Sequence, residues 1–435
     1  MSIYLLVNLT KYFLSAFSLA IYIVFSRNMF IINSMGIKDK EAIALQPYVP
    51  AYIRNKNRDL VFNLFLEYKE LSRADITKLS KISFPTVMKI VDYLLSKNLI
   101  LESSDTTSLY DSKLGRKGQM LRLNENAYSA VGISFEGKYL RIGLVNLCYE
   151  LLDHRTLVFD HDVNGIDKFS KNMTDAILEL KALHPETTVL GAGIGLSGVV
   201  DPVNRAINRH HVFGIYSPVA FDEVFTSFSE LPDFNVFIEN DVNASCLGEL
   251  MLRKKEGITD LVYLALGTGL GAGIIIDGEL RRGPSFFAGD VGNTLVAYTH
   301  DITRKQMSES KIENRINLRA IKNLYGVDVH HDVDVSIEKK QEICDYICSY
   351  MVPLIFNMYY VLDVGKFIIA GVTVEFLGNM LFERIDKELA LLIEYDEMRP
   401  TIKALPTVSN DASMIGGAAI TFQKVLPEIL NDMPS

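Results

Sequence analysis

Residues 261–292, LVYLALGTGLGAGIIIDGELRRGPSFFAGDVG, contain two apolar runs separated by a glycine-rich turn. The turn and the second run hold four glycines and a threonine: Gly267, Gly269, Gly271, Gly273 and Thr268. Glycine lets backbone N–H groups converge on an anion, and the threonine adds a hydroxyl, so these residues are candidates for a phosphate-binding loop. A tight β-hairpin turn has the same pattern, and this alternative stays open.

From Tyr128 onward, strand-like runs alternate with helical segments and glycine-rich turns. This alternation predicts α/β architecture. Within it, Asn240 and Asp241 follow a predicted strand at 236–238. An amide that both donates and accepts, next to a carboxylate, suits neighbouring sugar hydroxyls. A lone Asn-Asp pair more commonly forms a turn, and the preceding strand is what favours a ligand-binding role.

Residues 54–98 predict three helices. In the first, Asn57–Tyr68, the apolar face is Leu60, Val61, Leu64 and Phe65. Ser72 and Asp75 predict a capping box at the start of the second helix. Ser83 is expected to cap the third helix, with Pro85 in the first turn, where its missing N–H costs nothing. In that third helix we expect a buried stripe and an opposite exposed face: Val87, Ile90, Val91, Leu94 and Leu95 buried, and Thr86, Lys89 and Tyr93 exposed.

Two short apolar strands, 99–102 and 120–123, flank a polar stretch that carries Lys113, Arg116 and Lys117 around two glycines. This pattern predicts a β-hairpin with a basic tip. Helix, short helix, capped helix and basic hairpin, in that order, are the layout of a winged helix-turn-helix. The alternative is a three-helix protein-interaction module, which needs no basic glycine-rich hairpin.

The start of the third helix is the part that a winged helix-turn-helix presents to base edges in the major groove. The candidate DNA-binding residues there are Ser83, Phe84, Pro85, Thr86 and Lys89. Arg73 is placed for a phosphate, and Arg116 fits insertion into a narrow A/T-rich minor groove. Lys117 is expected to add a phosphate contact from the hairpin tip.

The charge is unevenly distributed along the 435 residues. The net charge is −9 overall, but residues 51–122 carry +5, residues 1–50 carry +2 and the remainder carries −16. A basic module in front of an acidic body is the asymmetry expected when only the first part contacts nucleic acid.

The four cysteines form no CxxC pair and no Cys/His cluster with metal-ligand spacing, so we expect neither disulfides nor a bound metal. Cys344 and Cys348, four residues apart on a helix, are expected to be core residues. An uncharged apolar run at 12–26, extendable to 32, has three interpretations: a membrane anchor, an apolar helix, or an extension translated from a misplaced start codon. We favour the last, because Met29 and Met35 both offer later starts.

The first part of the chain resembles the DNA-binding half of the ROK family (repressor, open reading frame, kinase), in particular its xylose-repressor-like members. The resemblance rests on four strings: Asn57-Arg58, Leu71-Ser72-Arg73-Ala74-Asp75, Ser83-Phe84-Pro85-Thr86-Val87 and Gly115-Arg116-Lys117. The rest of the chain resembles the ROK body, which implies a two-lobed actin/hexokinase-like (ribonuclease-H-like) fold.

The resemblance of the body implies a ligand site. Residues 191–202, GAGIGLSGVVDP, resemble the loop that faces the sugar, and we take Ser197 from it. In ROK kinases the aspartate that matches Asp241 is the general base. The family's Glu-x-Gly-His sugar motif appears here as Asp290-Val291-Gly292-Asn293, which adds Asp290 and Asn293 as candidate ligand-binding residues.

Departures from the kinase pattern decide the predicted activity. Residues 134–138, SFEGK, lack the aspartate and threonine of the first phosphate motif. Asn293 replaces a histidine that also binds zinc in the family, and no cysteine occurs between 298 and 324. Positioning and charge neutralisation supply most of phosphoryl-transfer catalysis, so we expect no kinase activity, no zinc and a vestigial Asp241 that contacts ligand.

The sequence therefore predicts a cytoplasmic repressor with three parts: an extension at 1–50, a winged helix-turn-helix at 51–123, and a ROK sensor domain at 128–430. Its expected partners are an inverted-repeat, A/T-rich operator, a sugar or sugar-phosphate effector and a second copy of the chain, with no cofactor. Two alternatives remain: an ATP-dependent sugar kinase with an added DNA-binding domain, and a ligand-blind DNA-binding scaffold.

Overall fold

The computed structural model describes residues 50–103, 119–136, 139–158, 161–210, 213–231, 233–297, 303–332, 334–393 and 402–431. The apolar run at 12–32 and the hairpin tip with Arg116 and Lys117 lie outside these residues. The chain divides into two compact units, residues 1–56 and residues 57–435, and the contacts described below lie within the second unit.

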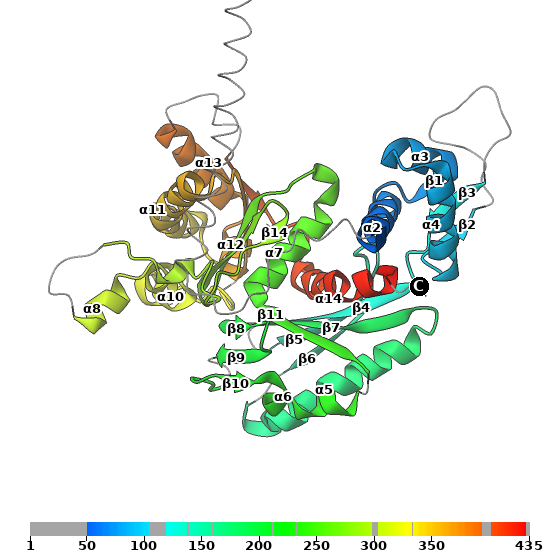
Figure 1. The fold of residues 1–435 in the computed structure, drawn as a ribbon. Helices are drawn as coiled ribbons and strands as arrows, with labels where there is room; N and C mark the ends of the chain where they lie inside the picture. Colours follow the sequence, from blue (N-terminus) through cyan, green and yellow to red (C-terminus); the bar gives the residue numbers. More distant parts are fainter. Residues whose placement is uncertain are drawn as a thin grey trace, which may run out of the picture. The chain divides into compact units, whose positions relative to one another are not determined.

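The first elements form a winged helix-turn-helix (Figure 1). Three helices are followed by a three-stranded antiparallel sheet of order β1-β3-β2. Their bounds are α2 Pro50–Tyr68, α3 Arg73–Ser80, α4 Phe84–Ser96, β1 Glu70–Ser72, β2 Ile100–Glu102 and β3 Met120–Leu123. The predicted helices and both hairpin strands are therefore present, whereas β1, a three-residue strand between α2 and α3, was not predicted.

The capping residues that separate these helices agree with the sequence pattern at α3 and differ at α4. Ser72 Oγ accepts the Asp75 N–H at 3.1 Å, and the Asp75 carboxylate accepts the Ser72 N–H at 3.0 Å, which completes the capping box. Ser83 precedes α4, but its hydroxyl contacts Thr86 Oγ1 at 2.9 Å instead of accepting a helix N–H. Pro85 lies in the first turn of α4.

Several predictions of burial differ from the structure in this part of the chain. Leu95, predicted buried, and Thr86, predicted exposed, are both half-buried. Leu60 is 43% exposed, because the core lies on the side of α2 that carries Val61, Phe62 and Phe65. Tyr93, predicted on the exposed face of α4, is buried. Its hydroxyl donates to the carbonyl of Ile429 at 2.6 Å, so a helix from the far end of the chain covers it.

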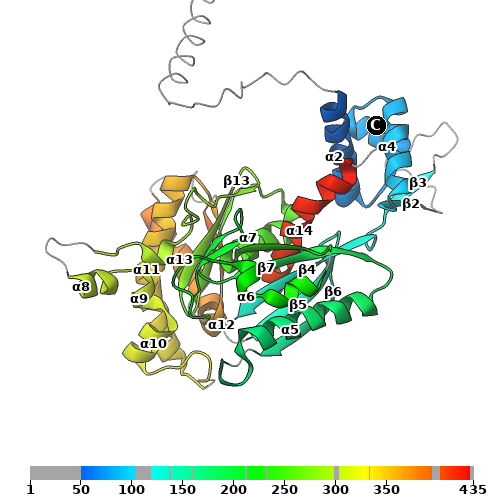
Figure 2. The same ribbon diagram turned by 60° about the horizontal axis from the view of Figure 1, so that its bottom comes forward.

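Two five-stranded sheets are the largest sheets in the rest of the fold, and both have the same plan (Figures 1 and 2). The first has the order β11-β7-β4-β5-β6 and the second β14-β13-β12-β15-β16. In each, three strands are antiparallel and two more run parallel to the first of them. This repeated arrangement is the two-lobed actin/hexokinase-like fold predicted from the resemblance.

The strand bounds of the two sheets are β4 Tyr128–Glu136, β5 Tyr139–Asn146, β6 Leu151–Val158, β7 Thr188–Leu196, β11 Asn235–Asn240, β12 Leu261–Leu266, β13 Leu270–Ile276, β14 Glu279–Leu280, β15 Lys366–Ala370 and β16 Lys403–Pro406. A small antiparallel sheet follows β7, with strands β8 Val199–Asp201, β9 Ala206–Arg209 and β10 Val219–Ala220. The helices around the sheets are α5 His161–Leu183, α6 Phe221–Val224, α7 Asp241–Leu252, α8 Arg304–Glu309, α9 Glu313–Ile316, α10 Leu318–Tyr325, α11 Ile337–Leu362, α12 Val372–Leu377, α13 Asn379–Leu392 and α14 Ala412–Asn431.

Helices α7 and α14 pack unusually closely, because glycines remove the side chains between them (Figure 1). A Cβ atom added to Gly416 would lie 1.7 Å from the carbonyl oxygen of Ala244, and one added to Gly248 would lie 1.8 Å from that of Ala412. Alpha-14 is equally close to the first sheet at Gly417, next to Gly193 of β7. The start of α7 and the whole first sheet are therefore fixed relative to α14.

The C-terminal end of α14 contacts the winged helix-turn-helix. Arg58, fully buried on α2, donates to the carbonyl of Leu430, and its guanidinium lies 4.3 Å from the Tyr93 ring. A cation at the C-terminus of a helix also interacts favourably with the helix dipole. Ile415, Ala418 and Phe422 of α14 share one hydrophobic core with residues of α2, α3 and α4.

Cys344 and Cys348 are both buried in the core of the second sheet, as predicted. Within the described residues, no group of three or more His, Cys, Asp or Glu side chains is arranged to hold a metal ion. No helix among the residues that the structure describes combines the length and the apolar composition that a membrane crossing requires.

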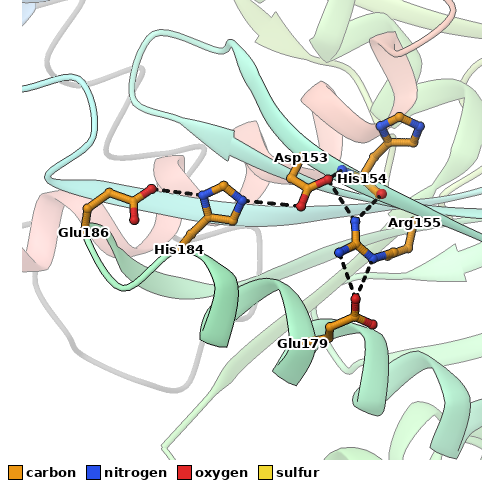
Figure 3. Close-up of polar contacts among 6 residues, drawn as sticks. All are labelled: Asp153, His154, Arg155, Glu179, His184 and Glu186. Atoms are coloured by element: carbon orange, nitrogen blue, oxygen red, sulfur yellow. Dashed lines mark hydrogen bonds and ion pairs between the residues drawn. The ribbon is translucent and has the colours of Figure 1, made fainter.

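A charged network joins β6 to the end of α5 on the surface of the first lobe (Figure 3). His184 contacts Glu186 at 2.9 Å and Asp153 at 3.4 Å. Arg155 contacts Glu179 and Asp153, each at 2.8 Å. The hydrogen bond to Glu186, with a further one to Asp153, raises the pKa of His184 above its ordinary value.

The raised pKa of His184 predicts a pH-dependent contribution to stability. A group whose pKa is higher in the folded protein stabilises it below the ordinary histidine value of about 6.5, and this contribution is lost as the pH rises through the raised pKa. We expect His184→Gln to lower the midpoint of thermal unfolding at pH 5.5, where the imidazole is charged, and to lower it less at pH 8.5, because this charge is lost as the pH rises. The effect at pH 5.5 should be no more than a few degrees, since solvent screens this network. Thermal unfolding of both proteins at the two pH values, with and without 1 M NaCl, measures this. A deficit of equal size at both pH values would contradict the assignment.

Candidate functional site

The N-terminal turn of α4 presents several of the predicted DNA-binding side chains to solvent. Phe84 is 51% exposed, Ser83, Pro85 and Lys89 are exposed, and Thr86 is half-buried next to Ser83. Arg73, half-buried at the start of α3, lies one element earlier. An exposed phenylalanine beside hydroxyl groups and a lysine provides apolar, hydrogen-bonding and charged contacts for the major groove.

Ser197, Asn240 and Asp241 are brought together by the first sheet. Beta-7 and β11 are parallel neighbours, with Leu196 opposite Asn240. The residues that follow both strands therefore lie at the same edge, which is where open α/β sheets bind ligands. The Asn240 side-chain amide donates to the carbonyl of Gly198 at 3.0 Å, and this bond ties the two segments together.

Asn240 and Asp241 also begin α7. Asn240 Oδ1 accepts the N–H groups of Val242 and Asn243, each at 3.0 Å, so it is the N-cap of the helix. The Asp241 carboxylate accepts the Val242 N–H at 2.9 Å and the Asn240 amide at 3.1 Å. Burial nevertheless raises the pKa of Asp241 to about 6, because desolvation disfavours the charged carboxylate more than these hydrogen bonds favour it.

A cavity of about 360 Å³ lies beside Asp241. Its walls come from the ends of β4, β12 and β15, from α12 and α13, and from the segment that leads into α14. Hydroxyl, amide and aromatic groups line it, among them Ser134, Ser409, Asn379 and Phe382. Of the predicted ligand-binding residues that the structure describes, Asp241 contributes to this lining, whereas Ser197, Asn240, Asp290 and Asn293 do not.

Two polar side chains next to Asn240 were missed by the sequence interpretation. Glu239, buried at the end of β11, accepts the Asn240 N–H at 3.0 Å and forms an ion pair with Arg282 at 2.6 Å. Arg282 lies in the segment after β14, so this pair joins the two lobes at the site. The signal for Glu239 was present in the string Glu239-Asn240-Asp241, but nothing in the sequence identified Arg282 as its partner.

The glycine-rich segment forms the hairpin between β12 and β13. The Gly267 N–H donates to the Gly269 carbonyl at 3.0 Å across the turn that contains Thr268. The Leu270 N–H donates to the Glu313 carboxylate at 3.1 Å. Gly271 and Gly273 lie within β13, where added Cβ atoms would be 3.0 Å from Val242 and 2.3 Å from Cys246 of α7. These two glycines allow β13 to approach the helix that begins at Asp241.

Asp290 and Asn293 form a separate exposed group. The Asn293 amide donates to the Asp290 carboxylate at 2.7 Å, and its oxygen accepts from Lys311 at 2.5 Å. Lys311 follows α8 and was not identified from the sequence. These bonds hold the segment after β14 against the segment before α9.

Comparison with known proteins assigns the chain to a family. The ROK family matches residues 130–424. The xylose repressor of Caldicellulosiruptor bescii is 30% identical over 254 residues, which cover 58% of this chain and 61% of that relative. The xylose repressor of Staphylococcus xylosus is 26% identical over 395 residues, which cover 86% of this chain and 96% of the relative.

A solved structure has the same fold over most of its length. It is a ROK family transcriptional regulator, a homologue of the Escherichia coli MLC protein, with 19% sequence identity and a TM-score of 0.67. The similarity covers 87% of this chain and 98% of that structure. Because the match to the ROK family covers residues 130–424, well over half of the sequence, the chain belongs to the ROK family.

Proposed function

We propose that the chain is a DNA-binding transcriptional repressor of carbohydrate-utilisation genes, gated by a sugar that binds beside Asp241. The observation that carries this proposal is the course of α14. Its first residues, Ala412 and Ser413, line the cavity, and its last turn binds Arg58 and Tyr93 of the DNA-binding helices. A ligand that favours one arrangement of the cavity therefore biases the position of those helices.

The cavity favours an uncharged sugar over a sugar phosphate. Asp241 and Glu375 are among its lining residues, and no Lys, Arg or His is among the described ones. A phosphate ester would bring negative charge next to these two carboxylates. The related repressors, which are named for xylose, support a pentose as the first sugar to try.

We infer that the chain is not a sugar kinase and carries no zinc or other cofactor. Ser134 is buried at the cavity wall. By sequence resemblance it belongs to the stretch that matches the first phosphate motif of the family's kinases but lacks its aspartate and threonine. Lys138, the other departure in that motif, lies outside the described residues. We also propose the domain limits 51–123 and 128–430 and a two-fold symmetric dimer. The operator that we propose is an A/T-rich inverted repeat, which Arg116 and Lys117 contact from the wing.

Operator recognition by α4 is the first test. We expect Thr86→Ala to reduce discrimination between operator variants, and Lys89→Met to weaken binding to all duplexes and to lower the salt dependence by about one counterion. Operators selected from a random duplex pool, followed by affinity measurements between 50 and 300 mM salt, give both quantities. Ser96→Ala, at the far end of α4, is the matched control. Unchanged affinity and discrimination in both α4 variants would contradict the assignment of the DNA-binding surface.

A further inference from the structure

His210 is a buried imidazole next to Ser197, one of the candidate ligand-binding residues. It follows β9, and its main chain forms two hydrogen bonds with Ile215, of 3.0 and 2.9 Å. Its ring is 1% exposed and stacks on Phe213, with the ring centres 4.1 Å apart and an angle of 15° between the planes. Both the position and the orientation of the ring are therefore fixed.

The hydrogen bonds of His210 determine which nitrogen carries the proton. Nδ1 accepts the N–H of Phe213 at 3.2 Å, so this nitrogen holds no hydrogen. A neutral imidazole has one N–H, which must then be on Nε2. Nε2 lies 3.3 Å from the hydroxyl oxygen of Ser197, so His210 is the donor in this contact and Ser197 the acceptor.

The backbone brings Ser197 to His210. Gly198 has a φ of +95°, and a Cβ atom added there would lie 2.1 Å from the carbonyl oxygen of Arg209. The Ser197–Gly198 segment therefore packs directly against the end of β9, and His210 is the residue that follows this strand. On its other side the Gly198 carbonyl accepts from Asn240. Ser197 thus lies between the imidazole and the Asn240–Asp241 helix start.

We propose that His210 is a positioning residue of the ligand site and that it acts through Ser197. Because the Ser197 oxygen accepts from Nε2, the hydrogen of Ser197 is available to a ligand. The site then selects a ligand with an acceptor oxygen at this place, such as a sugar hydroxyl or ring oxygen. This inference rests on the proposed function, and it adds the assumption that the sugar beside Asp241 extends past Asn240 to Ser197, which does not itself line the cavity.

A double-mutant cycle on the full-length protein tests this role. The probe is D-xylose, and its dissociation constant is measured by calorimetry. The variants are Ser197→Ala, His210→Phe, which keeps a flat ring against Phe213, and the two combined. A neutral hydrogen bond is worth about 0.5–1.5 kcal/mol, so each single variant should weaken binding by roughly 2- to 12-fold. If His210 acts through Ser197, the double variant should be no weaker than Ser197→Ala.

Rescue by a conservative variant separates positioning from packing. The amide N–H of His210→Gln should donate to Ser197 and restore most of the affinity, although it cannot stack as an aromatic ring does. Two results would overturn the role of His210 and leave the proposed function intact. One is that His210→Phe does not weaken D-xylose binding. The other is that His210→Phe weakens D-xylose binding equally in the wild type and in Ser197→Ala. If D-xylose does not bind the wild type, both this inference and the proposal of a pentose effector are overturned.

Discussion

Asp241→Ala is expected to lock the protein in its ligand-free regulatory state. A hydrogen bond from a sugar hydroxyl to a carboxylate is worth about 1.5–3 kcal/mol, so the variant should bind the effector roughly ten- to a hundredfold more weakly. Its operator affinity without effector should be unchanged, because Asp241 does not contact the DNA-binding helices. Asp241 lies at the start of α7, whereas those helices contact the C-terminal end of α14. The measurement is operator affinity across a titration of D-xylose and of D-xylose 5-phosphate.

The matched control for this experiment is Glu279→Gln, which removes an exposed carboxylate of β14. It should respond to the sugar as the wild type does. Identical responses of the wild type and Asp241→Ala would mean that this cavity is not the sensor, and the ligand-blind scaffold would then be the better account. A response to the phosphate ester alone would keep the repressor but reject the uncharged effector.

The Asp241 carboxylate should also make the affinity for the effector depend on pH. Burial raises the pKa of Asp241 to about 6, so the group is largely protonated at pH 5 and ionised at pH 7. An ionised carboxylate accepts a stronger hydrogen bond from a sugar hydroxyl than the neutral acid does. Effector affinity should therefore rise between pH 5 and pH 7 in the wild type, and this rise should be absent in Asp241→Ala.

The DNA-binding half was largely predictable because its signals are local. The capping box of Ser72 and Asp75 and the proline in the first turn of α4 each specify a boundary from neighbouring residues. The failure at Tyr93 has the opposite cause. Its partner, Ile429, is 336 positions away, and no periodicity within α4 reveals a helix that arrives from the end of the chain.

The candidate ligand site could be predicted only in the part that follows a strand end. Asn240 and Asp241 were singled out because they follow the predicted strand at 236–238, and in the structure Asn240 is the last residue of β11. Their neighbours were not found, because His210 and Arg282 reach the site from turns whose course depends on tertiary packing. The glycines of the hairpin illustrate the same limit, since Gly271 and Gly273 are explained by the approach of α7, which the sequence does not reveal.

Gly416→Ala is expected to destabilise the protein by about 3 kcal/mol or more, and this reverses the usual effect of the substitution. In a helix interior, alanine is normally more stable than glycine by roughly 0.5–1 kcal/mol. Here the new Cβ atom would lie 1.7 Å from the carbonyl oxygen of Ala244, so the backbones of α7 and α14 must move apart.

Urea unfolding of the full chain gives the free energy of unfolding. Gln423→Ala, at an exposed position of the same helix, is the control and should differ from the wild type by less than about 0.5 kcal/mol. Equal stability of Gly416→Ala and the control would show that the two helices are not in direct backbone contact, and the path from the cavity to Arg58 and Tyr93 would lose its physical basis.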